Sequence, residues 1–183
     1  MLLFVIVVVT LCLLFFLLSM VWPPDSPWSP WWRTNAKVAK AIVELAKITS
    51  DDVVYDLGCG DGTALITAAT MVGARGVGIE IDPSRAWIAK IRIWLHGLRH
   101  HLKIKRNDLF KENISEATVV VVYLIPKALK RLEHKFYQEL KPGTRIISFV
   151  YPIDYLKPDK IDAKNNLLLY TLSHPNSEKK RSR

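Results

Sequence analysis

A glycine-rich loop that follows a short apolar run is the feature that most limits the folds open to this chain. The run Val53–Tyr55 leads into residues 56–62, of sequence DLGCGDG, and residues 63–72 then have the small-residue composition of a helix. Glycine permits positive φ angles and a close approach of the backbone to another group. A loop of this kind between a strand and a helix is typical of α/β sheets that bind a ligand at their strand ends.

Apolar runs of strand length alternate with amphipathic segments along the rest of the chain. We expect helices at 35–48, 63–72, 84–96 and 127–140, and strands at 53–55, 76–83, 102–105, 118–124 and 145–150, followed by a hairpin at 161–163 and 167–172. Asn35 is the expected N-cap of the first of these helices, and Pro126 marks the end of the fourth strand. Such alternation predicts a mostly parallel, doubly wound sheet with right-handed crossovers.

The first 22 residues are almost wholly Leu, Val, Ile and Phe, and a helix of that length extends roughly 33 Å. We therefore expect residues 1–22 to form a transmembrane anchor. The segment 23–34, rich in Trp and Pro, then forms an interfacial linker. A cleaved signal peptide lacks support, because no positive region precedes the apolar run and no small-residue cleavage site follows it. A buried core helix would need a larger partner domain.

Charge gives the expected orientation of the anchor. No Lys or Arg precedes the apolar run, whereas Arg33, Lys37, Lys40 and Lys47 follow it, so the domain at 35–176 should face the cytoplasm or an equivalent inner side. The formal net charge of +9 suits a domain held against an anionic leaflet, and equally suits a nucleic-acid binder. Residues 177–183 form a short basic tail.

The spacing of the glycines indicates which cofactor the loop binds. The pattern Gly58-x-Gly60-x-Gly62 has Thr63 where the dinucleotide fingerprint needs its third glycine, which makes NAD the weaker candidate. For S-adenosylmethionine, the methionine moiety would pack against the loop, and Asp56 could take up its ammonium group. A tight turn without a ligand is the remaining alternative.

Carboxylates end the next two expected strands. Glu80 ends the second, where a carboxylate can accept hydrogen bonds from both ribose hydroxyls of a nucleoside. Asn107 and Asp108 follow the third, and Asp108 could accept the adenine amino hydrogen or simply cap a turn. No arrangement of His or Cys residues indicates a metal site.

Three segments resemble the class I S-adenosylmethionine-dependent methyltransferases. They are 54–62 (VYDLGCGDG), 77–80 (VGIE) and 107–110 (NDLF). The resemblance implies a Rossmann-like seven-stranded fold and S-adenosylmethionine as methyl donor. The expected cofactor-binding residues are Asp56, Gly58, Cys59, Gly60, Gly62, Glu80, Asn107 and Asp108.

More narrowly, the Trp/Pro linker, residues 108–111 (DLFK) and residues 121–126 (VVYLIP) are similar to membrane-associated protein-lysine methyltransferases that modify ATP synthase c-subunit and adenine nucleotide translocase. That similarity implies a lysine of a membrane protein as acceptor. The chain has Tyr-Leu-Ile-Pro where many amino-group methyltransferases carry Asn/Asp-Pro-Pro-Tyr. We expect Tyr123 to line the acceptor pocket and Pro126 to shape its entrance. A core aromatic at a strand end is the alternative for Tyr123.

Two other functions stay open on the sequence. One is methylation of RNA or of a small molecule. An RNA methyltransferase could contact phosphates through the basic stretch Arg99, Lys103, Lys105 and Arg106, although no RNA-binding module accompanies it and nucleic acid is the less expected partner. A non-catalytic assembly factor that binds the cofactor is a third possibility. The intact loop and Glu80 argue against this last interpretation.

Overall fold

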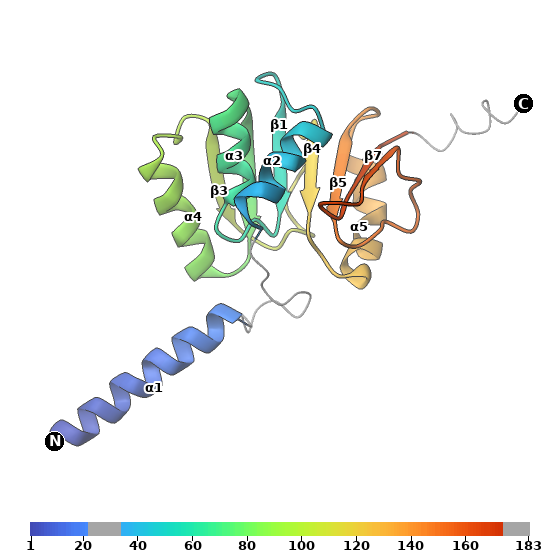
Figure 1. The fold of residues 1–183 in the computed structure, drawn as a ribbon. Helices are drawn as coiled ribbons and strands as arrows, with labels where there is room; N and C mark the ends of the chain where they lie inside the picture. Colours follow the sequence, from blue (N-terminus) through green and yellow to red (C-terminus); the bar gives the residue numbers. More distant parts are fainter. Residues whose placement is uncertain (22–33, 174–183) are drawn as a thin grey trace, which may run out of the picture.

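The computed structural model describes residues 1–21 and 34–173, with the side chains of 16–21 left aside (Figure 1). Its helices are α1 (Leu2–Val21), α2 (Ala36–Leu45), α3 (Thr63–Val72), α4 (Pro83–Leu95) and α5 (Pro126–Glu139). Its strands are β1 (Val53–Leu57), β2 (Arg75–Glu80), β3 (Leu102–Arg106), β4 (Val119–Val122), β5 (Arg145–Phe149), β6 (Lys160–Asp162) and β7 (Leu167–Thr171).

The strands form one seven-stranded sheet in the order β3-β2-β1-β4-β5-β7-β6. Strands β1 to β5 pair in parallel, while β7 pairs antiparallel with both β5 and β6. The chain order of neighbours reverses between β1 and β4, which is the position where ligands bind in such sheets. The predicted Rossmann-like, mostly parallel sheet closed by a hairpin is confirmed.

Two hydrophobic cores cover the two faces of the sheet. Helices α2, α3 and α4 pack on one face, with side chains such as Leu65 and Ile93 fully or almost fully buried. Helix α5 covers the other face, where Phe136 and Tyr170 are buried. Residues 107–118 join β3 to β4 without a helix. This face therefore carries one helix among the described residues.

Most expected element positions agree with the structure, and the differences occur at element ends. Asn35 is the N-cap of α2, and its side chain accepts a hydrogen bond from the Val38 amide. The prediction ran β2 on to Pro83 and began the next helix at Ser84. In fact β2 ends at Glu80 because Asp82 caps α4, with Pro83 at its first position.

The prediction for Pro126 needs the same kind of correction. The expected fourth strand ran to Leu124, with Pro126 as its stop, but β4 ends at Val122. Pro126 is instead the first residue of α5. The amide at this position has no hydrogen-bond partner within a helix, so the missing N–H of proline costs nothing there. The proline therefore starts a helix, and the chain between Val122 and Pro126 is extended loop.

Helix α1 carries only uncharged residues, and its side chains through Phe15 are all exposed. In the part of the chain that the structure describes, no helix meets both the length and the apolar character needed to cross a membrane. The predicted linker at 23–34 falls outside the described residues except for Thr34, and so does the predicted basic tail at 177–183.

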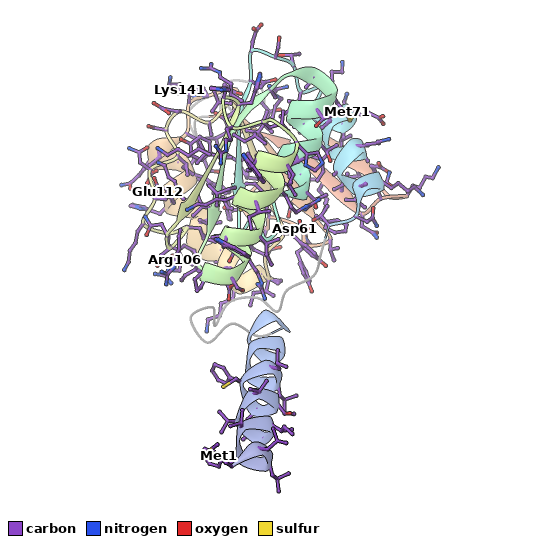
Figure 2. All side chains as sticks on the ribbon, turned by 90° about the vertical axis from the view of Figure 1, so that its left-hand side faces the viewer. Met1, Asp61, Met71, Arg106, Glu112 and Lys141 are labelled. Atoms are coloured by element: carbon purple, nitrogen blue, oxygen red, sulfur yellow. The ribbon has the colours of Figure 1, made fainter. Side chains whose placement is uncertain are left out.

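The carboxyl and amino ends of the parallel strands lie at opposite ends of the domain. Asp61, which follows β1, and Arg106, which ends β3, lie at one end in Figure 2, whereas Met71 and Lys141 lie at the other. We call the end of the domain with the carboxyl ends of the strands the carboxyl edge, and the opposite end the amino edge.

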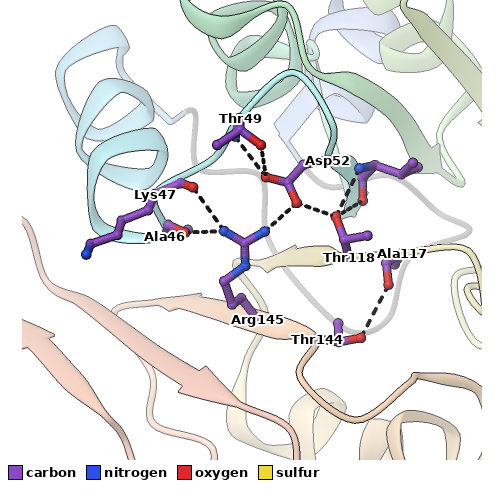
Figure 3. Close-up of polar contacts among 9 residues, drawn as sticks. Ala46, Lys47, Thr49, Asp52, Ala117, Thr118, Thr144 and Arg145 are labelled. Atoms are coloured by element: carbon purple, nitrogen blue, oxygen red, sulfur yellow. Dashed lines mark hydrogen bonds and ion pairs between the residues drawn. The ribbon is translucent and has the colours of Figure 1, made fainter.

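A polar cluster joins the starts of β1, β4 and β5 at the amino edge (Figure 3). The Asp52 carboxylate forms an ion pair with Arg145 and accepts a 2.7 Å hydrogen bond from the Thr118 hydroxyl. The Thr49 amide also donates to Asp52, at 2.8 Å. Burial raises the pKa of Asp52, but the hydrogen bonds from Thr118 and Thr49 and the Arg145 charge outweigh it and leave the pKa below its usual value.

The same cluster fixes the direction of α2. Arg145 donates to the carbonyls of Ala46 and Lys47 at 2.6 and 3.0 Å, which holds the carboxyl end of α2 at the amino edge. A ten-residue helix rises about 15 Å. Asn35 therefore lies toward the carboxyl edge, as Figure 1 shows for the start of α2.

Replacing Asp52 with Asn should lower the free energy of unfolding at neutral pH by about 1–3 kcal/mol, because Arg145 loses its charged partner. An acid whose pKa is lowered by folding stabilises the protein above its unfolded pKa, near 3.9, and that contribution is lost as pH falls through the folded pKa. Urea titrations at pH 7 and pH 3 should therefore differ less for Asp52→Asn than for the native chain. Asp51→Asn, at an exposed neighbouring position, is the control and should behave as native.

Candidate functional site

The loop between β1 and α3 turns on three glycines in the left-handed region. Gly58, Gly60 and Gly62 have φ angles of 87°, 54° and 78°. The Gly58 and Cys59 amides both donate to the Ile79 carbonyl of β2, at 2.8 and 3.1 Å. The loop is thereby held against the end of the neighbouring strand, and larger residues at these glycines would be strained.

Asp56 is a buried carboxylate within β1, next to this loop. Its exposed fraction is 7%, and no described residue donates a hydrogen bond to it. Burial, followed by the charges of Glu80 and Asp61, raises the pKa of Asp56 to about 7. A buried acid with carboxylates nearby and no donor is the kind of group that a bound cation would stabilise.

Glu80 ends β2 and holds the glycine loop through its carboxylate. One oxygen accepts from the Gly60 amide and the other from the Asp82 amide, both at 2.9 Å. Burial raises the pKa of Glu80, although these two hydrogen bonds oppose the rise. Each carboxylate oxygen has a further lone pair, so the predicted contact with a ribose remains compatible with this geometry.

An interaction that the sequence analysis did not predict joins α4 to the same loop. Arg92 forms a 2.7 Å ion pair with Asp61, and it also donates to the Asp61 carbonyl and the Thr63 hydroxyl at 2.8 and 2.9 Å. The Asp61 side chain in turn accepts from the Thr63 hydroxyl at 2.6 Å. Arg92 therefore fixes the start of α3 from the neighbouring helix.

Gly78 of β2 also contributes to the site, although it was predicted only as part of the segment 77–80 and not as a site residue. A β-carbon there would lie 2.6 Å from both the Cys59 sulfur and Ile104 Cδ1, and 2.9 Å from Leu65 Cδ1. The Cys59 side chain thus packs over β2, and burial raises the pKa of its thiol well above the usual value. Cys59 can reach a cofactor only through its backbone.

Gly78→Ala should destabilise the protein by about 1–3 kcal/mol through overpacking, and it should weaken cofactor binding because Cys59 must move. Thermal unfolding and calorimetric titration measure the two effects. Cys59→Ala removes one of the crowded atoms. The double variant should therefore recover part of the loss, whereas simple additivity of the two single variants would contradict this account.

Asn107 and Asp108 line an open cavity of about 440 Å³ together with Ile81 and Arg106. The Asn107 amide donates to the Glu80 carbonyl at 3.2 Å, which keeps this segment beside the end of β2. Asp108 accepts from the Phe110 amide at 3.0 Å and so caps a turn with one oxygen. Of the predicted residues at these two strand ends, Asn107 and Asp108 therefore line one cavity, and Asn107 also bonds to the backbone of Glu80.

Aromatic side chains lie at the ends of β4 and β5, on the other side of the switch point. The half-buried Tyr123 ring packs on Phe149, with centroids 4.4 Å apart and planes tilted by 53°. Burial and then the neighbouring Tyr151 raise the pKa of Tyr123. Pro126, the other predicted acceptor-site residue, is exposed at the start of α5.

A strained turn brings Tyr151 to this aromatic group. Val150 has φ of 71°, and the Tyr151 amide donates to the Phe149 carbonyl across it at 2.9 Å, as in a γ-turn. The buried Ser148 hydroxyl donates to the Tyr151 carbonyl at 2.5 Å. Strain of this kind in a branched residue concentrates at functional sites.

Comparison with known proteins assigns the arrangement to a family. The model of the ANTKMT methyltransferase domain matches residues 56–160, more than half of the chain. The chain belongs to this family. A Protein-lysine N-methyltransferase of Saccharolobus islandicus is 38% identical over 78% of this chain and 87% of its own length. An ATP synthase c-subunit lysine N-methyltransferase of Xenopus laevis is 35% identical over 70% of this chain, which spans 55% of that protein.

A solved structure supports the cofactor of this ANTKMT-domain methyltransferase. The RNA methyltransferase from Salinibacter ruber, in complex with S-adenosyl-L-homocysteine, has a TM-score of 0.74 and 37% identity. The match covers 76% of this chain and 93% of that one. The chain is an S-adenosylmethionine-dependent methyltransferase.

The residues present fit that cofactor. Asp56 offers a buried carboxylate without a donor, which suits the ammonium of the methionine moiety. Glu80 and the cavity at Asn107 and Asp108 lie where a nucleoside would follow from the loop. In the described residues, no group of three or more His, Cys, Asp or Glu side chains could hold a metal ion.

Proposed function

We propose that this methyltransferase transfers a methyl group to a lysine side chain of a membrane-associated protein. The observation that carries the proposal is the 38% identity with the Saccharolobus Protein-lysine N-methyltransferase over nearly all of that protein. The Xenopus relative, whose name specifies the c-subunit of ATP synthase, supports a membrane-associated acceptor.

The chain's own residues have distinct tasks in this proposal. When bound, the cofactor supplies an electrophilic methyl group on a sulfonium. Asp56 binds its ammonium, Glu80 its ribose, and Asn107 and Asp108 lie at its base. Because methyl transfer is an in-line displacement, alignment and exclusion of water are the main requirements on the protein.

The acceptor lysine would lie against the aromatic group at Tyr123, Phe149 and Tyr151. An unperturbed lysine has a pKa near 10.4, and an apolar surrounding lowers it, which favours the neutral amine that can attack the methyl group. The lysine proton leaves to solvent before transfer. Tyr123 packed on Phe149 supplies the apolar wall in this arrangement.

Membrane attachment through residues 1–22, with the domain on the cytoplasmic or equivalent inner side, is part of the proposal. The uncharged, exposed α1 supports it. The start of α2 toward the carboxyl edge adds a second argument. The polypeptide enters the domain on the edge that holds the candidate site, so an anchor in the preceding segment would keep that site near the bilayer.

A test uses the full chain with methyl-labelled S-adenosylmethionine and a membrane fraction of the source cells. We expect label in a protein band, at a lysine identified by mass spectrometry, and no label with Asp56→Asn. Label that resists nuclease and is lost with protease supports a protein acceptor. Label found at another residue type, or on lipid, would contradict the lysine proposal.

A methyltransferase acting on RNA is the second candidate, because the Salinibacter structure bears that title at 37% identity. The exposed side chains of Arg99, Lys103 and Arg106 could contact phosphates. In the same assay, label removed by nuclease and retained after protease would favour this candidate.

A further inference from the structure

The solvent-facing side of α4 is apolar, contrary to the usual pattern of a helix packed on a sheet. Trp87, Trp94 and Leu95 are exposed by 65%, 54% and 68%. Ile88 and Ile91 lie between them and are half-buried. A contiguous apolar surface of this kind on a small domain marks an interaction site.

The side of α4 that faces the sheet already packs in the core, so the exposed apolar residues are not needed for the fold. Ala86, Ala89 and Ile93 face the sheet and are nearly fully buried in the core shared with α3. They lie together on one side of the helix, opposite the exposed residues. Figure 2 looks onto this outer side of the domain.

The charged residues of α4, of the loop that follows it and of β3 are all basic. Residues 83–106 include no Asp or Glu. Lys90 of α4, Arg99 after it and Lys103 of β3 are exposed, and β3 is the edge strand of the sheet. The Arg99 guanidinium lies 5.6 Å from the centre of the Trp94 ring. A partner with negative charge beside apolar groups would complement both features.

We infer that the outer face of α4 docks on the headgroup region of an anionic lipid leaflet. Tryptophan concentrates at membrane interfaces, because its ring is apolar and its N–H reaches polar groups. Lys and Arg beside such a face attract anionic lipids, each by about fivefold in affinity. Leu95 and Ile91 would gain from contact with acyl chains but offer nothing to the bases or phosphates of RNA, which makes lipid the favoured partner.

Docking would hold the domain in one orientation at the bilayer. Helix α4 starts directly after Asp82, whose amide donates a hydrogen bond to the Glu80 carboxylate of the candidate cofactor site, so docking of α4 would also fix the orientation of that site.

The inference rests on the proposed membrane attachment. It adds a second contact with the bilayer, through α4, that attachment by residues 1–22 alone does not require.

The test places an environment-sensitive fluorophore on Leu95→Cys in the full chain with Cys12→Ser, because Cys59 is buried. The control carries the fluorophore on Lys130→Cys of α5, an exposed position on the opposite face. Vesicles contain phosphatidylcholine alone or with phosphatidylserine. Flotation reports whether the chain attaches, and the fluorophore reports whether α4 docks.

We expect a blue-shifted emission at position 95, quenched by lipid-borne quenchers, in phosphatidylserine vesicles only. The control at position 130 should stay water-exposed. Trp87→Ser with Trp94→Ser should abolish the shift, and Arg99→Gln should lower the docked-to-undocked ratio about fivefold. Calorimetric binding of S-adenosylmethionine checks that these variants remain folded.

Each other outcome overturns a defined part. A chain that does not float contradicts the membrane attachment itself. Flotation with a water-exposed label at position 95 contradicts docking and leaves attachment standing. A shift produced by an RNA oligonucleotide without vesicles would identify the surface as an RNA site, and a shift without any addition would mean that another part of the chain covers α4.

Discussion

Asp56→Asn should weaken S-adenosylmethionine binding by about 2–5 kcal/mol, or roughly thirtyfold to several-thousandfold in Kd. The variant removes the charge that would meet the cofactor ammonium, in a position only 7% exposed. Calorimetric titration of the full chain measures the change. Asp162→Asn, which alters a carboxylate in the distant β6, is the control and should bind as the native chain does.

The same carboxylate predicts a pH dependence. Because the pKa of Asp56 is raised to about 7 and the ammonium requires the ionised form, binding should release a proton and strengthen as pH rises through 7. Titrations near pH 6 in buffers of different ionisation enthalpy detect that proton. Affinity independent of pH between 6 and 8 would show that Asp56 does not meet the ammonium.

Stability of the cofactor-free protein should change in the opposite direction. An acid whose pKa is raised by folding stabilises the protein below its unfolded pKa, and this contribution is lost as pH rises through the folded pKa, here about 7. Asp56→Asn carries no such titration. The variant should therefore gain stability relative to the native chain at pH 8 while it loses cofactor affinity, a pairing that misfolding cannot produce.

Tyr123→Ala should lower kcat about a hundredfold while the Kd for S-adenosylmethionine stays within twofold of native. The ring packs on Phe149 at the end of β4, away from the cavity at Asn107 and Asp108, so its loss should disturb the acceptor rather than the cofactor. Turnover assays with a lysine acceptor measure the effect on the rate of methyl transfer, and calorimetric titration measures the effect on the Kd for S-adenosylmethionine.

Tyr123→Phe is the matched variant, because it keeps the ring and removes the hydroxyl. Near-native kcat in Tyr123→Phe would assign the effect to the aromatic wall, and a large loss would assign it to the hydroxyl. Unchanged kcat in Tyr123→Ala would remove Tyr123 from the acceptor site.

The sequence predicted those parts of the site that depend on local order along the chain. The strand, the glycine loop and the helix at 53–72 are consecutive, so pattern and spacing suffice to place Asp56 and the glycines at a strand end. Glu80 could be placed because parallel strands end at a common edge. The cofactor contacts themselves remain predictions.

Contacts between distant residues could not be predicted in this way. Arg92 lies 31 residues from Asp61, and helical periodicity gives its face but not the group it reaches. Asp52 and Arg145 are 93 residues apart, and their ion pair depends on the strand order. Pro126 was misplaced because a proline equally ends a strand or begins a helix, and only the following packing of α5 decides between them.

The antiparallel insertion of β7 has a practical consequence for attaching this enzyme to other molecules. Thr171 at the end of β7 pairs with Arg145 at the start of β5, so the strand finishes at the amino edge. A fluorescent protein, affinity handle or surface linker fused beyond β7 would leave from the edge opposite the cofactor loop. Immobilisation through a linker beyond β7 should leave the carboxyl edge open to large acceptors, whereas a fusion at the start of α2 would crowd that edge.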